Sequence, residues 1–134
     1  MKTRNVNQKF SLVPLGIMMA LIFAGIISCI GQKTNEKVFE AYELRINGHA
    51  DSAKVILEQL LSTDSTNALA WFELCRTDQH LGLSNPRAIQ EMLDNTLYAI
   101  DRAVENDPDN AYYLSYKGSI KTLQFYFALQ KYYY

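Results

Sequence analysis

The chain has 134 residues, of which 49% are hydrophobic and 20% charged, and its formal net charge is −1. This length leaves room for one domain at most. Beyond residue 28 the chain carries ten basic and 14 acidic residues, a net charge near −4, so it is no electrostatic match for nucleic acid or anionic lipid.

Residues 1–28 have the pattern of a secretory signal. Three basic residues and no acidic ones lie within residues 1–9, and residues 10–27 carry no charge. These are the n-region and h-region of an export signal. An uncleaved signal anchor is the alternative, because an uncharged run of 18 residues reaches the lower limit for spanning a bilayer. In both cases the basic end stays cytoplasmic and the remainder crosses the membrane.

The segment Ile26-Ile27-Ser28-Cys29 resembles the lipobox of bacterial lipoproteins. The resemblance implies a signal peptide over 1–28, fatty acylation of Cys29 with palmitate-type chains, and a membrane-anchored tether over 29–35. Each buried methylene of such chains adds about 0.8 kcal/mol of membrane affinity. We therefore expect a lipid-anchored protein of the bacterial cell envelope. Ile30 stands where an aspartate would suggest retention at the inner membrane, which favours the outer membrane, facing the periplasm.

Two helices are predicted between residues 36 and 67. Val38, Phe39, Tyr42 and Ile46 have helical spacing, and Asn47-Gly48 ends that helix because glycine accepts left-handed geometry. The next helix has Asp51 as its expected N-cap. Its apolar face comprises Ala53, Ile56, Leu57, Leu60 and Leu61.

Three further segments complete the predicted helices. Asn67 is the expected N-cap of a helix that ends at Leu81-Gly82, and Asn85-Pro86 begins the next, since proline suits a first helical turn. That helix ends at residues 106–110, and residues 111–134 again have helical spacing. No strand is needed, so the sequence predicts an all-α domain over 36–134.

Two junctions in the chain match each other. Residues 60–68 and 103–111 both read as two apolar residues, two variable ones, Asp, a turn pair, Asn and Ala. With the glycine turns, they resemble the tetratricopeptide repeat, a helix hairpin of about 34 residues. Trp71, Leu74 and Pro108 match residues of the repeat motif, although the second unit is nine residues too long. The resemblance implies units over 34–67, 68–110 and a partial 111–134, stacked as antiparallel hairpins in a short α-solenoid.

Small residues recur where such hairpins pack closely. They are Ala41, Ala53, Cys75, Ala103 and Gly118. Glycine inside a helix costs about 1 kcal/mol relative to alanine, so we expect close packing at Gly118 to offset that cost.

The repeat resemblance implies a scaffold or adaptor that binds a protein or peptide partner in a groove formed by the first helix of each unit. The groove residues this predicts are Tyr42, Arg45, Asp78, Tyr116 and Lys121. The aromatic C-terminus, with nine rings in the last 23 residues, leaves an alternative open, in which exposed tyrosines stack on a glycan or a small ligand. A truncated repeat protein without an independent role is the third reading.

The sequence shows no pattern typical of an enzyme or of a cofactor or metal site. His49 and His80 have no His, Cys or carboxylate neighbours at the spacing of metal ligands. The sequence also lacks a glycine-rich phosphate loop and a Gly-x-Ser-x-Gly nucleophile elbow. Cys75 has no base nearby and lies on the same helix face as Trp71, so we expect a buried, inert thiol. The sequence thus predicts a non-enzymatic protein that binds no cofactor, metal or nucleic acid.

Overall fold

A computed structural model describes residues 34–133, and every regular element within that range is helical. The elements are a helix over 34–46, α2 (Ala50–Thr63), α3 (Ala68–Leu83), the short 3₁₀ helix η1 (Pro86–Ala88), α4 (Ile89–Asn106) and α5 (Ala111–Tyr133). The all-α prediction is therefore confirmed for this range. The predicted signal peptide and Cys29 lie outside the described residues.

Local sequence signals set most of the helix boundaries. Gly48 has a φ of 86° in the turn after the helix over 34–46. Asn67 caps α3 by accepting a hydrogen bond of 2.9 Å from the Ala70 amide, and Asn85 caps η1 in the same way through the Arg87 amide. Asn110 accepts from the first amides of α5. These boundaries agree with the sequence-based predictions.

Two predicted boundaries differ from the structure. Asp51, the expected N-cap, lies within the first turn of α2, and His49 holds the cap position without a side-chain hydrogen bond. Gly82, the expected end of α3, lies inside that helix. A Cβ at Gly82 would stand 2.0 Å from Cγ of Met92 on α4. Glycine is therefore needed there for close contact between α3 and α4, not for a turn.

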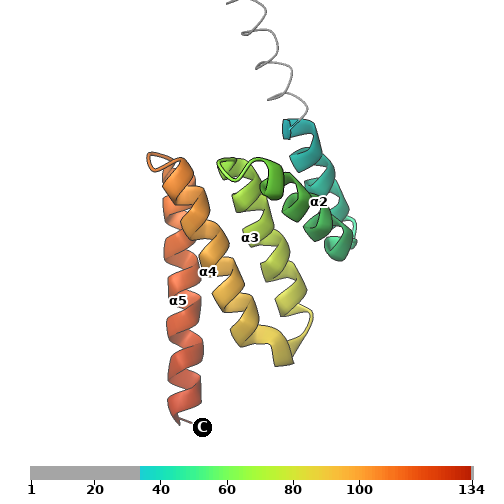
Figure 1. The fold of residues 1–134 in the computed structure, drawn as a ribbon. Helices are drawn as coiled ribbons and strands as arrows, with labels where there is room; N and C mark the ends of the chain where they lie inside the picture. The colour runs from blue at the N-terminus through green and yellow to red at the C-terminus, as the bar shows by residue number, and fades with distance from the viewer. Residues whose placement is uncertain (1–33, 134) are drawn as a thin grey trace, which may run out of the picture. The chain divides into compact units, whose positions relative to one another are not determined.

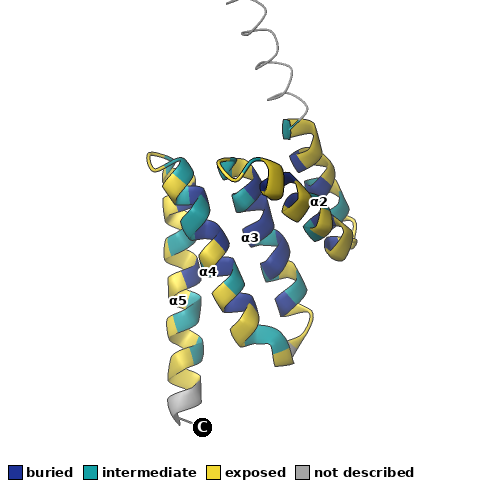
Figure 2. Ribbon diagram, in the orientation of Figure 1, coloured by how far each residue is buried: buried dark blue, intermediate teal, exposed yellow. Residues whose placement is uncertain are grey.

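The helices pack in chain order, so that α2 contacts α3, α3 contacts α4 and α4 contacts α5 (Figure 1). The core lies between them, and α3 is the most extensively buried helix (Figure 2). The largest fully buried side chains are Leu57, Leu93, Ile100, Ile120, Thr77, Thr96 and Cys75. No helix within residues 34–133 is both long and apolar enough to cross a membrane.

The predicted close packing at small residues is confirmed at four of the five positions. Ala41, Ala53, Cys75 and Ala103 are each 0% exposed. Gly118 is different, because it is exposed on α5 and a Cβ built there would meet nothing within 4 Å. The prediction that close packing offsets the cost of Gly118 is therefore wrong within this chain.

Candidate functional site

A buried ion pair joins the helix over 34–46 to α3. Nε of Arg45 donates to Oε1 of Glu73 at 2.5 Å, and the two side chains are 9% and 5% exposed. Nη1 of Arg76 lies 3.7 Å from the other carboxylate oxygen of Glu73. Nη2 of Arg45 is buried and has no hydrogen-bond partner among the described residues. Two guanidinium groups thus share one carboxylate.

Aromatic rings surround these two arginines. The guanidinium carbon of Arg45 lies 5.4 Å from the ring centroid of Tyr42, and that of Arg76 lies 5.9 Å from the same ring. Arg76 also lies 5.7 Å from the centroid of Phe72. A cation within about 6 Å of a ring face is attracted by the ring quadrupole. These contacts hold the positive charges beside an apolar surface.

That surface borders a pocket of about 380 Å³ between the helix over 34–46 and α3. Its apolar walls are Val38, Phe39, Tyr42, Leu69 and Phe72, and its polar walls are Asn35, Glu73 and Arg76. Phe39 and Leu69 remain 59% and 44% exposed. A volume of this size falls within the usual range of ligand-binding pockets. We call it the aromatic pocket.

Helix α5 extends this aromatic surface. The rings of Tyr112 and Tyr116 lie 5.3 Å and 5.2 Å from the ring of Phe72, centroid to centroid. The Tyr116 hydroxyl donates to Oε1 of Gln79 on α3. Burial is the main cause that raises the pKa of Tyr116, and the nearby arginines only partly oppose it. The hydroxyl therefore stays protonated and serves as a hydrogen-bond donor at neutral pH.

Three of the five predicted groove residues come together. Tyr42 lines the aromatic pocket, Arg45 lies against the Tyr42 ring, and Tyr116 packs on the edge of Phe72. Asp78 is instead bonded to Lys54 of α2, and Lys121 is exposed on α5 and does not line the aromatic pocket.

Sequence reasoning missed the three α3 residues at the centre of this site, Phe72, Glu73 and Arg76. A usable signal was present in their spacing. Arg76 follows Phe72 by four residues and Glu73 by three, so all three share one face of α3. The repeat resemblance depends on Trp71 and Leu74 and assigns no role to these three residues.

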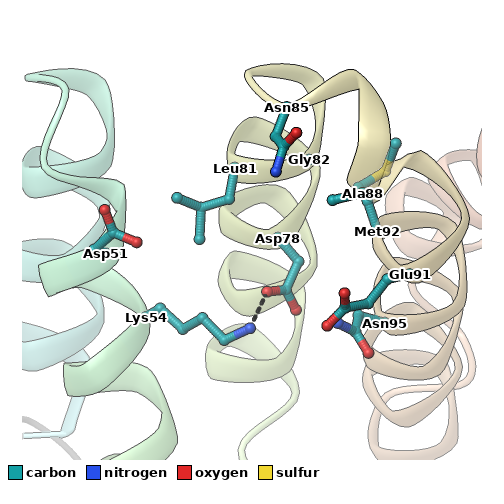
Figure 3. A pocket seen from close by; sticks show the side chains of 10 residues that line it. All are labelled: Asp51, Lys54, Asp78, Leu81, Gly82, Asn85, Ala88, Glu91, Met92 and Asn95. Atoms are coloured by element: carbon teal, nitrogen blue, oxygen red, sulfur yellow. Dashed lines mark hydrogen bonds and ion pairs between the residues drawn. The ribbon is translucent and has the colours of Figure 1, made fainter.

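A second pocket, of about 280 Å³, lies among α2, α3 and α4 (Figure 3). Carboxylates from Asp51, Asp78 and Glu91 line it together with one cation, Lys54, whose Nζ is 2.6 Å from Oδ1 of Asp78. Asn85 and Asn95 add two amides. Burial lowers the pKa of Lys54, but Asp78, Glu58 and Glu91 outweigh it and raise the pKa overall. We call this the acidic pocket.

Cys75 and the histidines have the surroundings that the sequence predicted for them. Cys75 is fully buried, and burial, with the charge of Asp78, raises its pKa to about 12. The thiolate needed for nucleophilic attack is therefore scarce at neutral pH. His49 and His80 are both exposed.

The chemistry that the site offers is recognition by packing and charge. The aromatic pocket combines apolar walls with the guanidinium group of Arg76 and the buried carboxylate of Glu73, and the acidic pocket combines three carboxylates with one ammonium group. Within residues 34–133 no group of three or more His, Cys, Asp or Glu side chains is placed to hold a metal ion. No protein-family model, curated protein or solved structure matches the chain.

Proposed function

We propose that this protein is a scaffold or adaptor of the bacterial cell envelope, anchored by acylated Cys29, whose helices form a short tetratricopeptide-like solenoid that binds a peptide. The order of helices supports the solenoid, because each hairpin packs on the next along the chain. The length of η1 and α4, which together span Pro86–Asn106, accounts for the extra residues of the second unit.

The observation that carries this proposal is the aromatic pocket. It lies between the first helices of the first two units, where the repeat resemblance puts a binding groove, and its apolar walls stay partly open to solvent. Exposed aromatic side chains beside arginine have the composition of interface hot spots. A groove of this kind suits an extended peptide that inserts one apolar side chain.

The charges of the pocket specify the peptide further. Glu73 is only 5% exposed and is bonded to Arg45, which does not line the pocket. The charge that the pocket presents to a ligand is therefore that of Arg76. A carboxylate next to the inserted apolar residue would be attracted to Arg76, which is about one third exposed. We therefore propose a ligand with an apolar residue beside an acidic one.

The glycan alternative receives less support from the tyrosines. The rings of Tyr112 and Tyr116 are tilted by 45°, and those of Tyr126 and Phe127 by 76°, so neither pair forms a flat stacking platform. The acidic pocket gives better support to the small-ligand alternative. Its three carboxylates and two amides suit a small amine, because one lysine leaves a net negative charge there.

The test is selection from a random peptide library displayed on phage, with the full chain in detergent as bait. Enriched peptides should pair an apolar with an acidic residue and should lose at least tenfold in affinity for Arg76→Glu. Val55→Asp is the matched control for Phe39→Asp, since Val55 is 53% and Phe39 59% exposed. Peptides that bind Phe39→Asp as well as the unchanged chain would refute the aromatic pocket as the site.

A further inference from the structure

One face of α5 has no partner among the described residues 34–133. Its members are all exposed, and they recur along the helix at alternating spacings of four and three residues, which places them in a single stripe. The stripe consists of Ala111, Ser115, Gly118, Thr122, Phe125 and Leu129. We call it the α5 seam. The seam spans roughly 27 Å at about 1.5 Å per residue.

The sizes of the seam residues change along the helix. The first three, Ala111, Ser115 and Gly118, are small, whereas Phe125 and Leu129 near the other end are large and remain 64% and 40% exposed. A second helix packed against the seam would explain both the small residues at one end and the large exposed residues at the other. It would fill the space over Gly118 and cover the large side chains. Figure 2 shows the C-terminal half of α5, up to its last turn, as largely exposed.

We propose that the α5 seam is a homodimer interface, in which α5 of a second copy packs antiparallel against it. A two-fold axis near residue 120 makes the seam complementary to itself. Ala111 then meets Leu129 of the second copy, Ser115 meets Phe125, and Gly118 meets Thr122. Every large residue faces a small one, so the two helices stay evenly spaced.

A parallel arrangement would not fit in this way. It would place Phe125 against Phe125 and Leu129 against Leu129, while Ala111 and Gly118 faced their own copies across a gap. Contacts between the large side chains would hold the two helices apart where their small residues face each other. The antiparallel arrangement is the one that the order of residue sizes favours.

The charges of α5 allow a second copy at this face. Helix α5 contains three lysines and no acidic residue, and Lys117 is already paired with Asp101 of α4 at 2.7 Å. Residues 34–110 contain all 14 acidic residues and only six basic ones, so a two-fold dimer through that part of the chain would bring like charges together. The α5 seam itself is uncharged. The Lys121 side chains at its edge can extend into water, as long lysine side chains do.

The area available sets the strength of the dimer. Phe125 and Leu129 of the seam, together with Leu114 and Tyr126, which adjoin it along α5, are 40–64% exposed. A whole aromatic side chain buries about 150–250 Å². These four residues and the small ones between them would bury roughly 500 Å² per copy, at the low end for specific interfaces. The dimer is therefore weak in solution, and anchoring of both copies in one membrane would strengthen it by raising their local concentration.

Disulfide cross-linking of the full chain in its membrane tests this arrangement. Ser115→Cys and Phe125→Cys in one chain cannot bond to each other, because ten residues separate them by about 15 Å. Mild oxidation should give a dimer band for this double variant and none for either single variant. Ser115→Cys with Gln130→Cys is the control, since Gln130 is exposed on α5 but lies off the seam. The unchanged chain, oxidised in the same way, shows how much of the dimer band comes from disulfides of Cys29 or Cys75.

A second variant separates packing from folding. Gly118→Glu in the double-cysteine background should reduce the dimer band at least tenfold while circular dichroism stays helical, because a Cβ at position 118 would meet no atom within 4 Å. Dimers of the single-cysteine variants would instead indicate parallel helices and overturn the proposal. So would cross-links to a chain of another mass, or the absence of any dimer band. The peptide-binding experiment is independent of these outcomes, since the α5 seam does not line the aromatic pocket.

Discussion

Arg45 and Glu73, which are 28 residues apart in the chain, form a buried ion pair between two helices. Both side chains are less than one tenth exposed, so the pair is shielded from water and salt. Removal of one partner would leave an uncompensated charge in a medium of low polarity. This pair therefore fixes how the helix over 34–46 packs on α3, and with it the shape of the aromatic pocket.

Glu73→Gln should lower the free energy of unfolding by about 3 kcal/mol, because Arg45 would keep its charge without a counter-ion. The matched control is Glu105→Gln. Glu105 is also 2.5 Å from an arginine, Arg102, but its side chain is 60% exposed. The control should lose less than about 0.5 kcal/mol. Urea denaturation followed by the fluorescence of the single tryptophan measures both, and equal losses would contradict the buried role of Glu73.

The two helical glycines should respond to alanine in opposite directions. Gly82→Ala should destabilise the fold by about 1–3 kcal/mol, since the added Cβ would overlap Met92. Gly118→Ala should stabilise the single chain by up to about 1 kcal/mol, because alanine is the better helix former and the site is open. Thermal unfolding at low protein concentration measures both. A stabilising Gly82→Ala would show that α3 and α4 are further apart than described.

Stability should fall at alkaline pH. The pKa of Cys75 is raised from 9.0 to about 12, so above pH 9 the unfolded chain releases a proton that the folded chain retains. The unfolded state then binds fewer protons, and the free energy of unfolding declines as pH rises from 9 towards 12. Tyr113 and Tyr116 act in the same direction above pH 10, because burial raises the pKa of each.

Cys75→Ala provides the control for this pH dependence. It should flatten the decline between pH 9 and 10, where the thiol is the first of these three groups to ionise in the unfolded chain. Denaturation midpoints measured from pH 7 to 10.5 give the comparison. An equally steep decline in the variant would show that another group is responsible.

The caps of α2 and α3 should differ in importance. Asn67→Ala removes a hydrogen bond of 2.9 Å to the Ala70 amide and should cost about 1 kcal/mol. Asp51→Ala should cost only a few tenths, because Asp51 lies within the first turn and contributes through the helix dipole. Chemical denaturation of the two variants tests this order. A larger loss for Asp51→Ala would restore Asp51 as the cap of α2.

Only part of the site could be predicted from the sequence. Tyr42 and Tyr116 were identified because the repeat resemblance assigns them to first helices, and the structure places both against Phe72 or its pocket. Arg45 was expected to face a ligand, yet it is 7% exposed and bonded to Glu73. Asp78 was expected in the same groove but lines the acidic pocket with Lys54. Both differences come from a partner on a neighbouring helix that helical spacing cannot reveal.

The sequence by itself determined most of the helix boundaries, although not the cap of α2 or the end of α3. Gly48, Asn67 and Asn110 act on amides or dihedral angles within a few residues of themselves, so their effects can be read locally. Apolar spacing likewise determined the faces of α2 and α4 that enter the core.

Only the tertiary structure decided which charges are paired across helices and which glycine is crowded. The pairs Arg45 with Glu73 and Lys54 with Asp78 span 28 and 24 residues. Gly82 and Gly118 both lie inside helices, yet one touches Met92 and the other faces open space. The physical reason is range, since capping and helical hydrogen bonds form within about four residues, whereas burial depends on how distant helices pack.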